Sequence, residues 1–295
     1  MLQATGEPFP VTVHPFPSPK RGGSHAYELG NTSAKNAVVF IGGLTDGPHT
    51  TPYIRTVAKH LENSSSLDYS VFEIRMRSSF IGFGTSSLAN DVEDISALVK
   101  YLRGRGKERI VLFGHSTGCQ DCMEYTNYAK HHAEPVDGFI LQAPVSDREG
   151  LDAPESEQRE SLAVAEQMIA EGKSDWCVPK DKVPKSFEAP MSAYRLWSLM
   201  AKDGDDDYFS ADLEDEKVRR HWGRFEKPVL VLHSGEEEFV PKSIDQVALN
   251  KRYQDASPMV SRLSGLIPGA GHAVEDDAAR EWLAVRTAEF LETLQ

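Results

Sequence analysis

Short runs of apolar residues alternate along the chain with longer segments in which apolar residues recur every three or four positions. The first pattern is typical of buried parallel strands, and the second of amphipathic helices that cover them. Two short edge strands are expected in the Pro- and Gly-rich region at the start of the chain. The predicted strands are Pro10–His14, His25–Leu29, Ala37–Ile41, Tyr69–Met76, Arg109–Phe113, Val136–Gln142, Pro228–His233 and Ser261–Leu266.

The helices between these strands have recognisable starts. Thr51-Pro52 combines an N-cap residue with proline at the first helical position, ahead of an apolar stripe. Further helices are predicted over Asp91–Leu102, Thr117–Lys130 and Asp277–Leu294. Strands that alternate with helices predict an α/β fold with a mostly parallel central sheet flanked by helices.

The stretch from Ser146 to Arg224 interrupts this alternation. It has no buried-strand pattern, yet it is too long for a bare loop and contains two helix-like apolar patterns. We interpret residues 146–224 as a helical cap or lid inserted between two strands. The core domain would then comprise residues 1–145 and 225–295.

Charge limits the classes of partner. The chain of 295 residues has 45 acidic and 32 basic residues, which gives a formal net charge of −13. Such a balance argues against nucleic acid and anionic membranes as partners. Neither an apolar run of about 18 residues nor a basic, apolar secretory leader is evident, so we expect a cytoplasmic protein.

The three cysteines allow two interpretations of one motif. Cys119 and Cys122 form a C-x-x-C pair, and Cys177 stands apart. The pair would be a redox motif if it began a helix beside the sheet. Alternatively, residues three apart share one face of a helix, and both thiols would pack against the core. The second interpretation is favoured, because another motif occupies the helix start.

That motif is G-x-S-x-G, at Gly114-His115-Ser116-Thr117-Gly118. The pattern alone is common, but here a buried strand ends directly before it and a helix begins directly after it. This strand–turn–helix context is typical of a nucleophile elbow, in which a strained serine projects above the sheet. Ser116 is therefore the candidate nucleophile.

A serine nucleophile requires a base and an acid, which follow it along the chain in this architecture. His272 lies on a Gly-rich loop after the last predicted strand, where it is free to reach Ser116. The acid should follow the strand Pro228–His233, where the sequence is Ser-Gly-Glu-Glu-Glu-Phe-Val-Pro. Alignment on G-x-D-x-x-V-P places Glu237 at the acid position, with Glu238 as the alternative.

Acyl transfer also requires hydrogen-bond donors for the oxyanion. We expect the backbone N–H of Thr117 to be one donor. The second should come from the loop after Ala37–Ile41, through the amide of Leu44, with Gly43 as the alternative. The loop from Ser78 to Gly84 ends at the same edge of the sheet, and its phenylalanines would either line the pocket or pack within the loop.

One acidic run has the residue spacing of a calcium-binding loop. Asp203, Asp205, Asp207 and Glu214 have the EF-hand spacing, but Tyr208 stands where that loop requires glycine. We interpret the run as a solvated acidic face. No metal or organic cofactor is expected.

The segments FIGGLTDG, Ser78–Thr85 and GHSTGCQD resemble a group of intracellular fungal and plant α/β-hydrolases. That group includes esterases that act on fusarinine-type ferric siderophores. The resemblance implies an α/β-hydrolase fold and a serine esterase with Ser116 and His272 in the triad. The group more often has aspartate where Glu237 stands.

The predicted function is thus hydrolysis of a small-molecule ester by Ser116, His272 and Glu237, with a hydroxamate siderophore as the preferred substrate. Two alternatives remain open at this stage. One is a binding protein that retains the fold without catalysis. The other is an acyltransferase, thioesterase or amidase that uses the same triad, since residue types alone do not separate transfer from hydrolysis.

Overall fold

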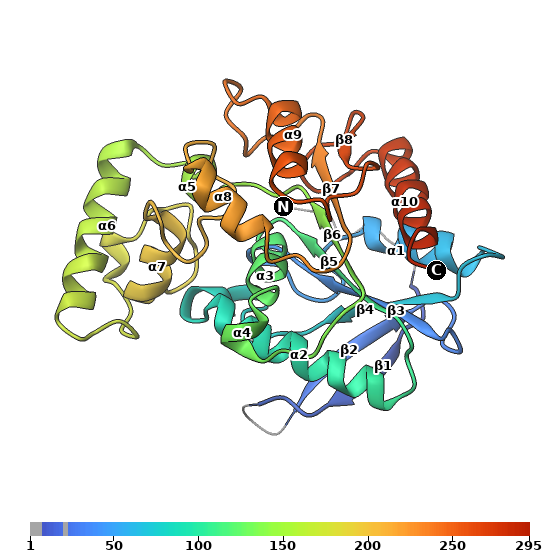
Figure 1. Cartoon of the computed structure of the whole chain (residues 1–295). Helices are drawn as coiled ribbons and strands as arrows, with labels where there is room; N and C mark the ends of the chain where they lie inside the picture. The colour runs from blue at the N-terminus through green and yellow to red at the C-terminus, as the bar shows by residue number, and fades with distance from the viewer. Residues whose placement is uncertain (1–7, 20–22) are drawn as a thin grey trace.

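The computed structural model describes residues 8–19 and 23–295. Its centre is a single eight-stranded sheet in the order β1-β2-β4-β3-β5-β6-β7-β8 (Figure 1). The strands are β1 Thr12–Phe16, β2 Ser24–Leu29, β3 Asn36–Ile41, β4 Tyr69–Ile74, β5 Ile110–His115, β6 Gly138–Gln142, β7 Val229–Ser234 and β8 Gly265–Ile267. The expectation of a mostly parallel sheet is confirmed, because β3 to β8 pair in parallel and only the β1–β2 and β2–β4 pairs are antiparallel.

Helices cover both faces of the sheet, and alternate strand residues point to each of them. In β3, Val38 and Phe40 join the apolar cluster under α1 (Tyr53–Glu62) and α10 (Asp277–Glu292). Ala37, Val39 and Ile41 join the opposite cluster, under α2 (Leu88–Gly104), α3 (Gly118–Tyr125) and α9 (Gln246–Ala256). Since every residue of β3 is buried, this strand and its neighbours form a rigid base for the loops at their carboxyl ends.

The remaining elements complete the covering layers. They are the helices α2 Leu88–Gly104, α3 Gly118–Tyr125, α4 Tyr128–His131, α9 Gln246–Ala256 and the 3-10 helix η1 Phe80–Thr85. No helix in residues 8–19 and 23–295 is both long enough and apolar enough to cross a membrane.

Between β6 and β7 the chain forms the expected helical insertion. Its elements are α5 Asp147–Gly150, α6 Glu155–Ala170, the 3-10 helix η2 Lys180–Lys182, α7 Ala193–Met200 and α8 Asp215–Trp222. Helices α6 and α7 lie beside the sheet in Figure 1 and share a separate apolar cluster, which also contains Phe83 of η1. Helix α8 contributes Val218 and Trp222 to the core cluster on the sheet instead. The domain boundaries at 146 and 224 stay a prediction.

Several predicted boundaries were wrong for local reasons. The helix expected over Thr117–Lys130 is divided into α3 and α4, because the Thr126 hydroxyl donates to the Met123 carbonyl (2.6 Å) where α3 ends. Helix α2 starts at Leu88, since the Ser87 side chain accepts from the Asn90 N–H at its N-terminus.

Three further differences affect short or weakly patterned elements. The first edge strand lies at Thr12–Phe16 rather than Pro10–His14. The last strand, β8, covers only Gly265–Ile267, so most of Ser261–Leu266 lies outside the strand. Helix α9 was not predicted at all, because few of its residues are buried and its apolar stripe is weak.

Candidate active site

Ser116 occupies the sharp turn between β5 and α3. Its φ of 53° lies in the left-handed region, a strained conformation for a residue with a side chain. The flanking glycines are required by close backbone approach. A Cβ on Gly114 would lie 2.2 Å from the Gly118 carbonyl oxygen, and one on Gly118 would lie 2.3 Å from that of Ile41. The turn therefore holds the serine at the carboxyl edge of the sheet, beside the end of β3.

His272 lies between Ser116 and a buried carboxylate. Its Nε2 is 2.8 Å from Ser116 Oγ, and its Nδ1 is 2.8 Å from Glu237 Oε1. The Glu237 side chain is only 1% exposed, and its Oε1 also accepts the Phe239 N–H at 3.2 Å. The Phe239 ring stands edge-on to the imidazole, with 4.7 Å between ring centroids. The structure thus brings the three predicted residues into one hydrogen-bonded chain.

Glu238 has a different place. Its Oε2 accepts the backbone N–H of His272 at 2.7 Å, and the residue is exposed. It contacts the main chain of the histidine loop, whereas Glu237 contacts the imidazole. Of the two candidate acids, Glu237 is the one with the geometry of a triad member.

The predicted oxyanion donors border one cavity. Gly43, Leu44 and Thr117 all line it, together with Asp46 and Phe83. The Gly43 N–H already donates to Asp46 Oδ2 at 2.8 Å. In the described part of the chain, the N–H groups of Leu44 and Thr117 have no acceptor. Leu44, rather than Gly43, thus has an amide available for an oxyanion.

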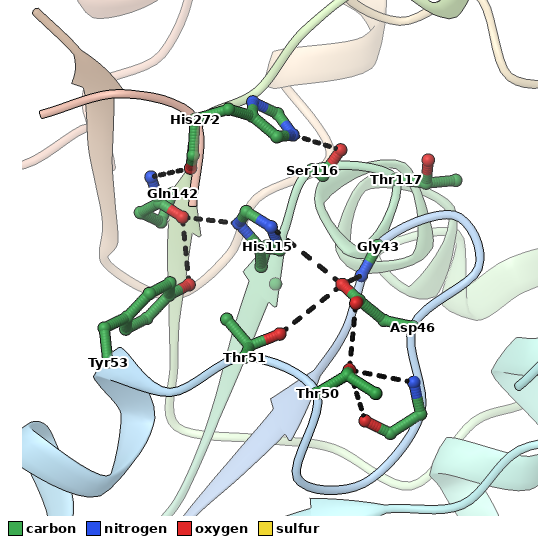
Figure 2. A network of polar contacts seen from close by, with 12 residues as sticks. Gly43, Asp46, Thr50, Thr51, Tyr53, His115, Ser116, Thr117, Gln142 and His272 are labelled. Carbon is green, nitrogen blue, oxygen red and sulfur yellow. Dashed lines mark hydrogen bonds and ion pairs between the residues drawn. The ribbon is translucent and has the colours of Figure 1, made fainter. Parts of the chain in front are cut away.

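A buried polar network lies under these residues (Figure 2). Gln142, at the end of β6, accepts hydrogen bonds at Oε1 from the Tyr53 hydroxyl (2.9 Å) and from His115 Nδ1 (2.6 Å). Its Nε2 donates to Ser234 Oγ at 3.2 Å and to the His272 carbonyl at 3.4 Å. One amide side chain therefore ties together the strands and loops that carry the site.

His115 is neutral within this network. Burial, together with the nearby His272, lowers its pKa to about 4. Since Gln142 Oε1 accepts from Nδ1, the proton of the neutral ring lies on Nδ1. Sequence reasoning missed both His115 and Gln142. The available signal was a polar residue at the carboxyl end of an otherwise apolar strand, in Phe-Ile-Leu-Gln of β6.

The loop from Ser78 to Gly84 divides between the two expected roles. Ser78, Ser79 and Phe83 line the cavity, and Phe83 is buried against the insertion. Phe80 is 45% exposed and packs over Gly47, where a Cβ would lie 2.3 Å from the ring.

The other two sequence motifs, the C-x-x-C pair and the acidic run, make contacts that serve the fold. Cys119 and Cys122 are free, buried thiols in the core cluster, and burial raises the pKa of both well above its ordinary value. Thiols of this kind are poor nucleophiles, so the C-x-x-C pair lacks the surroundings of a redox site.

The carboxylates of the acidic run contact the chain's own donors. Asp203 pairs with Lys217 at 2.7 Å, Asp205 accepts from the Tyr194 hydroxyl at 2.5 Å, and the buried Asp207 accepts the Asp203 N–H at 2.9 Å. Within the described residues no group of three or more His, Cys, Asp or Glu side chains has the arrangement of a metal site.

Comparison with known proteins shows which proteins this chain resembles. The model of a family described as "Protein of unknown function (DUF1749)" matches residues 4–292. An esterase of Emericella nidulans is 29% identical, over 91% of this chain and 88% of its own length. The fusarinine C esterase sidJ of Aspergillus fumigatus is 28% identical, over 86% and 87% respectively. The solved structure of the siderophore hydrolase EstB from Aspergillus fumigatus superposes with a TM-score of 0.79, at 28% identity, and covers 98% of this chain and 99% of that one.

Proposed function

Because the chain belongs to the DUF1749 family and is an esterase of the α/β-hydrolase fold, we propose that Ser116, His272 and Glu237 are its catalytic triad. The observation that carries this proposal is the pair of 2.8 Å contacts that join His272 to Ser116 Oγ and to Glu237 Oε1. Both lie within the range expected of a nucleophile–base–acid relay.

In the proposed reaction, Ser116 Oγ attacks the ester carbonyl carbon while its proton passes to His272 Nε2. The bond from carbon to the leaving oxygen then breaks, and His272 returns the proton to that oxygen, which departs as an alcohol. A water molecule repeats the sequence on the acyl-enzyme and releases the carboxylic acid. Glu237 keeps the Nδ1 proton in place and stabilises the imidazolium.

The oxyanion that forms in each half of the reaction would be stabilised by the N–H groups of Thr117 and Leu44. This assignment is supported by the free state of these two amides beside the cavity. Preorganised backbone donors are effective because they need no reorganisation when the charge develops.

We propose a hydroxamate siderophore ester of the fusarinine type as the substrate. The support is that one relative is a fusarinine C esterase and that the similar solved structure is a siderophore hydrolase. Both matches cover most of this chain. We also keep the predicted cytoplasmic location as a proposal, testable by fractionating cells that express the full chain.

The triad is tested by fluorophosphonate labelling of the full chain, read by intact mass and peptide mapping. One adduct per chain is expected at Ser116, and none in Ser116→Ala. A folded wild type that takes up no label, or labels elsewhere, would contradict the proposal and would favour a binding protein.

The substrate class is tested by incubating the enzyme with ferric and iron-free fusarinine C and resolving the products by liquid chromatography and mass spectrometry. Stepwise opening to linear hydroxamate acids, abolished in Ser116→Ala, is expected. Adding a competing alcohol separates hydrolysis from transfer, because a transferase would yield the new ester. Activity on short acyl esters without any siderophore cleavage would refute the substrate but leave the triad intact.

A further inference from the structure

The loop from Gly43 to Asp46 is a tight turn closed at both ends by one residue. The Asp46 N–H donates to the Gly43 carbonyl at 3.1 Å, and Asp46 Oδ2 accepts the Gly43 N–H at 2.8 Å. Leu44 and Thr45 are the central residues. Because both polar groups of Gly43 are bonded to Asp46, the first free amide of the turn belongs to Leu44.

The turn is strained and pressed against the nucleophile. Thr45 has a φ of 68°, which lies in the left-handed region. Turns that need this conformation at their third residue usually have glycine there. A Cβ on Gly43 would lie 2.6 Å from Ser116 Cβ. Such a turn requires support from its surroundings, since left-handed backbone at a non-glycine residue costs of order 1–3 kcal/mol.

Asp46 is itself fixed from three sides. Its carboxylate accepts from the hydroxyls of Thr50 (2.9 Å) and Thr51 (3.4 Å), and its carbonyl accepts the Phe80 N–H at 2.8 Å. Figure 2 shows this side chain below Ser116, between the Gly43 N–H and the two threonines. Its 22% exposed side chain leaves it partly open to solvent, so a substitution there does not create a cavity in the core.

We propose that Asp46 is the positioning residue of the oxyanion turn. It holds Gly43 and the strained Thr45 so that the Leu44 N–H stays aligned for the developing oxyanion, without touching substrate itself. This inference rests on the proposed function, because it assumes that Leu44 is an oxyanion donor. A backbone donor cannot be deleted by changing its own side chain, so Asp46 is the position through which that donor is tested.

The test compares Asp46→Ala, Asp46→Asn and the double variant Thr45→Gly/Asp46→Ala in the full chain. Steady-state kinetics on a p-nitrophenyl ester gives kcat and KM, and a trifluoromethyl ketone, whose adduct carries an oxyanion, gives Ki. Deleting an oxyanion donor costs about 10²–10³ in kcat, so displacing one should cost about 10- to 100-fold. We expect that loss in Asp46→Ala, with KM within about threefold and Ki raised by the factor by which kcat/KM falls.

Two variants separate positioning from general stability. Asp46→Asn keeps an acceptor oxygen for the Gly43 N–H and should recover most of the activity. In the double variant, glycine removes the strain at position 45, so the turn needs its clamp less and activity should partly return. Asn31→Ala is the matched control, because Asn31 closes a similar turn remote from Ser116 by accepting the Ser33 N–H at 3.0 Å. Its activity should not change.

A folded Asp46→Ala with wild-type kcat and Ki would overturn the inference. If Asp46→Ala fails to fold, the double variant decides: a folded double variant as inactive as Ser116→Ala would also overturn it. Failure of the proposed function is recognised separately, because then the wild type would take up no fluorophosphonate at Ser116, whatever residue 46 is.

Discussion

Replacing Glu237 by glutamine should lower kcat far more than replacing the adjacent Glu238 by glutamine. In Glu237→Gln the amide is isosteric with the acid but carries no charge beside the His272 imidazolium. Two unit charges about 4 Å apart interact by about 4 kcal/mol at an effective dielectric constant near 20, which corresponds to about 10³ in rate. An amide in place of a triad acid also risks the wrong imidazole tautomer, for which losses near 10⁴ are known. We expect kcat to fall by about 10³–10⁴.

The surroundings of Glu237 explain why the amide cannot adapt. Its Oε1 accepts from both His272 Nδ1 and the Phe239 N–H, while its Oε2 is buried without a partner among the described residues. If the amide oxygen replaces Oε1, the NH₂ group is buried without an acceptor, which costs about 1–3 kcal/mol of stability. If the amide is reversed, the NH₂ group faces Nδ1, and the ring must move its proton to Nε2, where it can no longer accept from Ser116.

Glu238→Gln should retain at least a tenth of the wild-type activity. The side chain is exposed, and a neutral amide oxygen can still accept the His272 N–H that Glu238 Oε2 now accepts at 2.7 Å. Initial rates on a p-nitrophenyl ester, corrected for active sites by burst titration, measure both variants, and thermal unfolding verifies that each is folded. The reasoning is refuted if folded Glu237→Gln stays within tenfold of wild type, or if Glu238→Gln shows the larger loss.

Three further outcomes follow from the same structure. Gly43→Ala should lower kcat at least ~100-fold, because the new Cβ would lie 2.6 Å from Ser116 Cβ. Gly104→Ala is the control and should remain active, since a Cβ there would have nothing within 4 Å. Equal activity of the two variants would contradict the close approach of Gly43 to Ser116. Burial lowers the pKa of His233 to about 4, so below about pH 6.5 the unfolded state binds a proton that the folded state does not, and stability falls by about 3 kcal/mol between about pH 6.5 and 4. His233→Phe should therefore gain stability relative to wild type as the pH is lowered in denaturant titrations, and parallel pH curves would exclude this. Thiol titration should find one reactive cysteine, the exposed Cys177, in the native protein and three after unfolding; rapid reaction of all three in the native state would revive the redox interpretation.

The parts of the fold that the sequence predicted are those in which one local pattern decides the outcome. Buried parallel strands such as β3 appear as unbroken apolar runs, and an elbow requires glycines on both sides of its serine. Elements with a weak apolar pattern, or with an end set by a single side chain, were missed or misplaced. Helix α9 buries few of its residues, and the break between α3 and α4 depends on a Thr126 hydroxyl that binds the backbone of its own turn.

In the site, too, some features could be predicted from local sequence and others required the folded structure. The residue types and order of Ser116, Glu237 and His272 were available from motif and loop positions, but the separation of Glu237 from Glu238 required knowing which carboxylate is buried. Spacing along the chain is nearly the same for both, and only the folded loop directs one side chain to the imidazole and the other to the backbone N–H of His272. The two adjacent glutamates therefore contact different parts of the same residue: Glu237 contacts the imidazole ring of His272, and Glu238 contacts its main chain.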